Sequence, residues 1–202
     1  MLPVCLLLML LLAPLGAAEL PAATASPGEL GPLWQIDSEQ SGCDFSLRAL
    51  HWFKVSGHFS RIEGTVSASP EGPQATIRVP ITSVRMSSKG RRDWALSPEF
   101  FDAARFPELR FDAVLPGLDR ESLRQPIKGS MLLRGIRGAV RFRVTEVDCD
   151  PLNTHCLILA KSSVSRRRFG MTSQRLLLGD RVKLKLRLFL HRVAPLPADG
   201  KP

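Results

Sequence analysis

The stretch Arg181-Val-Lys-Leu-Lys-Leu-Arg-Leu-Phe-Leu-His191 alternates polar and apolar residues, so that its valine and four of its leucines share one face. Successive side chains of an extended chain point to opposite faces, and the stretch is therefore predicted to be a β-strand with one dry and one wet side. The same alternation recurs over residues 140–144 and 45–48. Antiparallel strands of this kind must close around something apolar, which predicts an all-β fold.

Further segments with strand character extend this pattern along the chain, and together they suit an antiparallel barrel of about eight main strands. The predicted strands are 33–37, 43–50, 53–60, 62–69, 75–86, 108–115, 125–135, 138–147, 155–164 and 181–191.

One segment, residues 88–104, lacks the two-residue alternation of a β-strand. Its apolar residues recur at three- and four-residue spacings, and Ser97-Pro98-Glu99 supplies a cap followed by proline at a first helical position. We therefore expect a short helical insertion, made of two short helices, near residues 88–104. Its aromatic side chains would cover an open end of the barrel.

The 202 residues, 44% of them hydrophobic, are enough for one sizeable core. We expect a single barrel domain over residues 33–193. Residues 1–18 are almost purely apolar and are predicted to be a cleaved signal peptide, with an uncleaved anchor as the alternative. Residues 19–32 are expected to be a flexible lead-in and residues 194–202 a disordered tail. The predicted signal peptide indicates export from the cytoplasm.

The formal charge of +9 is carried mainly by arginine. In a cytoplasmic protein such a charge would favour nucleic acid as a partner, but the export signal argues against it. Many cations occupy alternate strand positions, which is typical of a solvated outer face. The alternative is a surface that docks on the anionic headgroups of a membrane. A homodimer is a further alternative that the sequence leaves undecided.

Cysteine usage agrees with export. Cys149 and Cys156 flank a segment whose Pro151 and Asn153 favour a tight turn, so we predict a disulfide between them. Cys43 is then left over, unless it pairs with one of the other two. A zinc site is not expected, because the chain has neither a CxxC pair nor closely spaced histidines.

The sequence offers little for catalysis. Its four histidines are scattered, and no GxSxG motif occurs. Acidic residues of the expected helices, such as Asp93 and Glu99, also serve as helix caps. We therefore expect neither an enzyme nor a cofactor.

Several motifs, taken in order, resemble those of one family. They are Trp34-Gln-Ile-Asp37, Val55-Ser-Gly57-His-Phe59 followed by Gly64, Phe100-Phe-Asp102 followed by Phe106-Pro107 and Phe111, Gly129 to Gly135 with Leu132, and Arg166 followed by Phe169-Gly170-Met171. The chain is thus similar to the YceI-like family over residues 33–193. This resemblance implies a lipocalin-like antiparallel barrel, exported to the periplasm, whose interior holds a polyisoprenoid or a similar amphiphile. Two departures concern the ligand's polar end, because Gln40-Ser41 stands where many members carry His-Ser, and Ala49 stands where a second histidine is frequent.

The predicted ligand-binding residues fall into three groups. Seven are inward by alternation, three belong to the helical insertion, and three lie at a basic turn where the Arg166 guanidinium would hold a phosphate or quinone oxygen. Phe169 and Met171 share a strand parity and would line the cavity or belong to the ordinary core. The three groups are Phe45, Leu47, Phe59, Ile77, Val79, Phe111 and Phe142; Trp94, Phe100 and Phe101; and Arg166, Phe169 and Met171.

Two functions follow from the sequence. The first is the non-covalent binding, sequestration or transport of an isoprenoid-like lipid or quinone inside the barrel. The second is an envelope or stress-response interaction protein, with a barrel filled by its own side chains and a basic docking face. Alternation alone does not separate them, because a few larger inward residues would fill a tunnel without changing the pattern.

Overall fold

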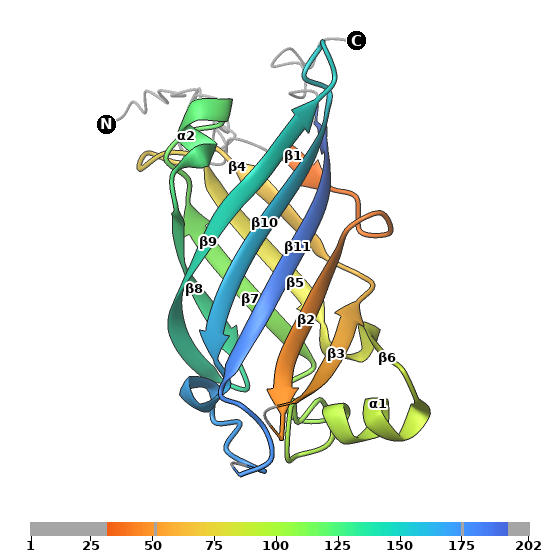
Figure 1. The fold of residues 1–202 in the computed structure, drawn as a ribbon. Coiled ribbons are helices and arrows are strands. Elements are labelled where there is room, and N and C mark those ends of the chain that lie inside the picture. Colours follow the sequence, from red (N-terminus) through yellow and green to blue (C-terminus); the bar gives the residue numbers. More distant parts are fainter. Residues whose placement is uncertain (1–31, 51, 175, 194–202) are drawn as a thin grey trace, which may run out of the picture.

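The backbone forms a closed antiparallel β-barrel, which confirms the predicted fold class (Figure 1). The structure is a computed structural model that describes residues 32–50, 52–174 and 176–193. The predicted signal peptide, the lead-in up to residue 31 and the tail lie outside the described residues.

Eight strands close the barrel in the order β1-β4-β5-β7-β8-β9-β10-β11, with β11 pairing back to β1. Three more strands continue from β11 in the order β2-β3-β6. The bounds are β1 (Pro32–Ile36), β2 (Gly42–Ala49), β3 (Phe53–Phe59), β4 (Glu63–Ser67), β5 (Gln74–Pro80), β6 (Val84–Met86), β7 (Glu108–Val114), β8 (Ile127–Leu133), β9 (Ile136–Cys149), β10 (His155–Ser165) and β11 (Arg181–Arg192).

Three positions in the barrel are each occupied by two strands that lie end to end. β1 and β2 both pair with β11. On their other side, β1 pairs with β4 and β2 pairs with β3. Next to these, β4 pairs with β5 and β3 pairs with β6. The prediction of one strand over residues 75–86 was wrong, because the 3-10 turn Ile81–Ser83 divides it into β5 and β6. Proline at position 80 has no N–H to continue the ladder. The turn buries Ile81 completely and lets its N–H donate to the Pro107 carbonyl.

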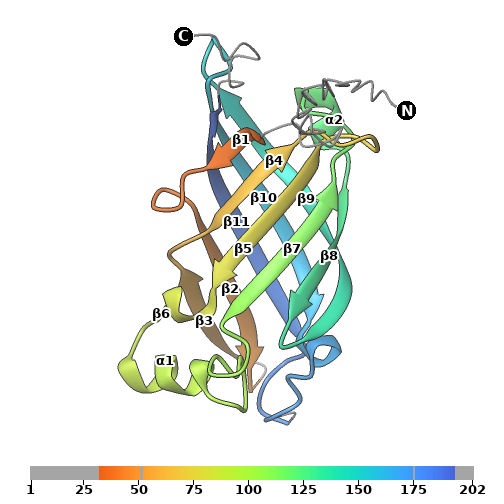
Figure 2. The same cartoon turned by 180° about the vertical axis from the view of Figure 1, so that it is seen from behind.

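The helical insertion is present, but it contains one helix where two were expected. Helix α1 (Lys89–Leu96) is capped by the Ser88 side chain, and Ser97 ends this helix where a new start was predicted. Residues 98–101 form turns instead, because the Phe101 N–H donates to the Ala95 carbonyl. The second short helix, α2 (Arg120–Arg124), lies elsewhere, at the opposite end of the barrel, and was not predicted (Figure 2). We call the two ends the α1 end and the α2 end. No helix in the described ranges is long and apolar enough to cross a membrane.

The predicted disulfide is present and joins Cys149 to Cys156, which face each other on β9 and β10. In the turn between them, backbone N–H groups of His155 and Thr154 donate to the Asp150 carboxylate and lower its pKa. Cys43 is a buried free thiol. Burial raises the pKa of Cys43 to about 12, so this thiol stays protonated and unreactive at neutral pH.

Candidate functional site

The barrel encloses an apolar cavity of about 70 Å³ in the half that adjoins the α2 end. All eight strands of the closed barrel contribute its walls, and Leu123 of α2 closes it at the α2 end. Thr65 is the one wall residue with a polar side chain. The walls are Ile36, Thr65, Val66, Ala75, Ile77, Phe111, Leu115, Leu123, Ile127, Phe142, Val144, Ile158, Ala160, Leu186, Leu188 and Leu190.

The boundary of the cavity toward the α1 end lies at the middle of the barrel. On β5 the lining includes Ile77 but not Val79, the next inward residue toward the α1 end. The rings of Phe111 and Phe142 meet edge to face at this level, with centroids 5.1 Å apart. Gly129 makes room for this pair, because a Cβ there would lie 2.4 Å from the Phe111 ring.

Aromatic side chains fill the other half of the barrel. The rings of Phe45, Phe59 and Phe101 form a triangle with centroid separations of 5.4 to 5.9 Å. Phe100 continues this cluster at 4.8 Å from Phe101, and Trp94 stacks on it at 5.0 Å. The insertion therefore plugs the α1 end with its phenylalanines, in geometries that aromatic pairs prefer.

The predicted binding residues divide between these two halves. Ile77, Phe111 and Phe142 line the cavity. Phe45, Leu47, Phe59, Val79, Phe100, Phe101, Phe169 and Met171 are buried core residues that do not line it, and Trp94 is partly buried against that core.

Arg166 has a different role from the predicted contact with a ligand headgroup. Its side chain is 1% exposed, and its guanidinium donates to backbone carbonyls of the loop before β11. The acceptors are the carbonyl oxygens of Met171, Ser173, Leu178 and Gly179, at 2.5 to 3.1 Å. A buried guanidinium with this many acceptors holds a loop in place. The structure therefore corrects the prediction for Arg166, whose guanidinium stabilises the loop before β11.

For Phe169 and Met171 the structure gives the second alternative, the ordinary core, and the expected strand parity was wrong because neither residue lies on a strand. Residues Arg166–Phe169 form a 3-10 turn that ends at Gly170, whose φ of 74° is in the left-handed region that favours glycine. Phe169 packs its ring against Gly138 of β9, where a Cβ would approach the ring to 3.0 Å. Both side chains therefore complete the core at the α1 end.

Most residues of the cavity wall are not among the predicted binding residues. Leu186, Leu188 and Leu190 belong to the alternating face of the stretch that predicted the fold, and that parity alone would have identified them. Leu123 carried no comparable signal, since its position depends on the unpredicted helix α2.

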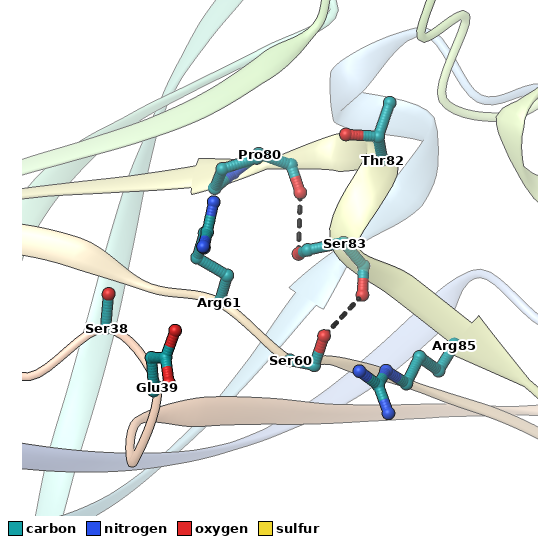
Figure 3. Close-up of a pocket in the computed structure, with 8 residues that line it drawn as sticks. All are labelled: Ser38, Glu39, Ser60, Arg61, Pro80, Thr82, Ser83 and Arg85. Atoms are coloured by element: carbon teal, nitrogen blue, oxygen red, sulfur yellow. Dashed lines mark hydrogen bonds between the residues drawn. The ribbon is translucent and has the colours of Figure 1, made fainter.

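A second hollow lies on the outer wall, where β3 and β4 and then β5 and β6 are interrupted (Figure 3). It is an open, polar groove of about 440 Å³. The Ser60 hydroxyl donates to the Ser83 carbonyl at 3.1 Å, and the Ser83 hydroxyl donates to the Pro80 carbonyl at 2.7 Å. Because these hydroxyls are engaged with backbone and no histidine lines the groove, it does not have the arrangement of a nucleophile and its base. The lining is Ser38, Glu39, Ser60, Arg61, Pro80, Thr82, Ser83 and Arg85.

Metal ligands do not converge in the part of the chain that the structure describes, where no three His, Cys, Asp or Glu side chains come together. The candidate binding site is therefore the internal cavity. Its walls favour an apolar ligand, and only Thr65 could form a side-chain hydrogen bond with a polar group.

Comparison with known proteins places this cavity in context. The sequence model of the YceI-like domain matches residues 34–190. Comparison with curated protein sequences gives no significant match.

Three solved structures share the fold at low sequence identity. A polyisoprenoid binding domain from Saccharophagus degradans has 12% identity and a TM-score of 0.64, and the match covers 81% of this chain and all of that one. BcnA from Burkholderia cenocepacia has 17% identity and a TM-score of 0.65, with 76% and 98% covered. The YCEI protein of Campylobacter jejuni has 16% identity and a TM-score of 0.58, with 73% and 90% covered.

Proposed function

Because the chain belongs to the YceI-like family, we propose that its barrel binds the apolar chain of an isoprenoid-like lipid or an isoprenoid quinone without a covalent bond. The observation that carries this proposal is the internal cavity, whose wall has no exposed polar surface. The structural neighbour from Saccharophagus degradans, described as a polyisoprenoid binding domain, supports the same ligand class.

The size of the cavity defines how such a ligand fits. A space of about 70 Å³ holds only a short piece of a chain, so a longer ligand has to displace wall side chains. Phe111 and Phe142 stand at the boundary between the cavity and the aromatic half, and their rotation would lengthen the available space. Each methylene-sized unit that enters contributes roughly 0.8 kcal/mol, which offsets the cost of moving a ring after a few carbons.

The polar end of the ligand has no prepared anchor near β1. Asp37 accepts hydrogen bonds from the Gln40 backbone N–H and side-chain amide, and these bonds lower the Asp37 pKa and occupy both residues. The Ser41 hydroxyl is buried and accepts from the Phe189 N–H at 2.9 Å. Affinity should therefore follow the length of the apolar chain and depend little on the headgroup.

We further propose that the protein works in the periplasm as a carrier, scavenger or reservoir, and that it catalyses no reaction. The predicted signal peptide supports export, and the disulfide between Cys149 and Cys156 is typical of an oxidising compartment. The role follows from solubility, since the barrel keeps in water a molecule that otherwise partitions into membranes.

A chain-length series tests this function. Delipidated protein is titrated with isoprenoid alcohols of increasing length, and each alcohol is compared with the quinone or phosphate that carries the same chain. We expect each added isoprene unit that the barrel buries to raise the affinity by up to about a thousandfold, since five carbon groups contribute about 4 kcal/mol, and we expect the headgroup to change the affinity little. Equal affinities across all lengths, or no binding at any length, would contradict the proposal.

The filled half of the barrel supports a second function. Aromatic side chains already fill the α1 half, as an interaction protein with no internal ligand would require. Such a protein would show no binding in the chain-length series, and it would retain specific protein partners after its lipids are extracted.

A further inference from the structure

Large apolar side chains are exposed together at the α1 end of the barrel. Two loops carry them: the turn between β2 and β3, and the loop that leads into β11. Their exposed fractions are 48% for Leu50, 88% for Trp52, 65% for Phe53, 93% for Leu176 and 48% for Leu177. Single exposed apolar residues are ordinary, but a contiguous group usually marks an interaction site. We call this group the apolar tip.

Backbone pairing holds the two loops side by side. The Leu50 N–H donates to the Leu177 carbonyl at 2.7 Å, and the Gly179 N–H donates to the Arg48 carbonyl at 2.8 Å. Ala49 pairs with Phe53 on one side and with Leu178 on the other. Figures 1 and 2 show both loops projecting from the α1 end, away from α2. Backbone hydrogen bonds therefore join the described parts of the two loops into one surface.

Leu50 combines an unfavourable backbone conformation with an exposed apolar side chain. Its φ is 47°, in the left-handed region where Asn and Gly are the favoured residues. A leucine here adds backbone strain and also leaves a large apolar side chain half in water. Neither feature contributes to the core of the barrel.

Cations surround the apolar tip on the strands that lead to it. Arg48 and Lys54 lie directly opposite each other on β2 and β3, and Arg181 and Lys183 follow on β11. All four side chains are exposed, and the structure gives none of them an ion pair within its described residues. Like charges placed directly across a strand pair repel each other. An external anionic surface would relieve this repulsion. We call these four residues the basic collar.

We propose that the apolar tip and the basic collar dock this end of the barrel onto an anionic lipid bilayer. Trp52 and Phe53 would enter the headgroup region, where aromatic side chains partition well, while the collar would contact lipid phosphates. We propose a bilayer as the partner because large apolar side chains are exposed at the tip and all four collar residues are cations, a combination that suits an anionic lipid surface. This inference does not depend on the ligand of the cavity.

Vesicle cosedimentation tests the proposal with protein exported and processed by its own host. We expect binding to phosphatidylcholine vesicles that contain phosphatidylglycerol, little binding to phosphatidylcholine alone, and weaker binding as salt rises from about 0.1 to 0.5 M. Trp52→Ser with Phe53→Ser should weaken binding about tenfold or more. Arg48→Ser with Lys54→Ser should weaken it about 25-fold, since each cation contributes about fivefold.

Matched controls separate docking from a general loss of stability or from anchoring by another segment. Leu152→Ser with Arg120→Ser removes an exposed leucine and an exposed cation at the α2 end, and it should leave binding unchanged. Trp52→Phe should keep binding but lose most of the fluorescence quenching by brominated lipids. Equal binding by all variants would overturn the proposal. So would folded tip variants that change only the oligomeric state or the capture of a protein.

Discussion

Filling the cavity with a leucine at position 160 should abolish ligand binding without unfolding the protein. Ala160 lies on β10, is 4% exposed and lines the cavity of about 70 Å³. Leucine adds three carbon groups, whose burial contributes about 2.4 kcal/mol, while crowding in a packed core costs about 1 to 3 kcal/mol. The net change in the free energy of unfolding should therefore stay within about 1.5 kcal/mol.

The effect on the ligand should be much larger. If leucine excludes one isoprene unit of five carbons, the lost burial is about 4 kcal/mol, close to a thousandfold in Kd. The assay combines urea unfolding with titration by the longest isoprenoid alcohol that the wild type binds. Ala139→Leu is the matched control, because Ala139 is exposed on β9 and should change neither quantity. A folded Ala160→Leu variant with wild-type affinity would refute the placement of the ligand in this cavity.

Three further predictions concern stability. Arg166→Leu leaves buried carbonyls without a donor and should cost about 3 to 5 kcal/mol in urea unfolding, with unchanged lipid content in the folded fraction. Although burial acts to raise the pKa of Asp180, hydrogen bonds from Arg167 and Ser165 lower it to about 2. Above pH 4 the free energy of unfolding of the wild type should thus exceed that of Asp180→Asn by about 1 to 2 kcal/mol. This difference should be lost as the pH falls through the folded-state pKa of about 2. Replacing Cys149 and Cys156 by serine should cost about 2.5 kcal/mol in thermal or urea unfolding, since the bridge closes a short loop.

The fold followed from the sequence because strand alternation and burial express the same periodicity. The stretch from Arg181 to His191 places its valine and leucines inward, as β11 does in the barrel. The disulfide followed because two cysteines at the ends of a tight turn face each other once the hairpin forms. Each of these features rests on local chemistry that a single segment contains.

The cavity and the breaks in the strands depend on contacts that no single segment contains. Position 81 reads as part of a continuous strand, but the Pro107 carbonyl from a distant loop stabilises a turn there. Arg166 reads as a free cation, and only the loop folded around it supplies its acceptors. Whether an inward side chain fills the barrel or lines a space is decided by the residues opposite it, as with Gly129 and Phe111.

The most direct test of the central claim is native mass spectrometry on protein exported by its own host, followed by extraction and fragmentation of whatever dissociates from it. We predict a bound isoprenoid or isoprenoid quinone in near-stoichiometric amount, lost in the Ala160→Leu variant and retained in Ala139→Leu. A bare protein mass that persists after host lipids are added back would contradict the claim and would favour a barrel filled by its own side chains.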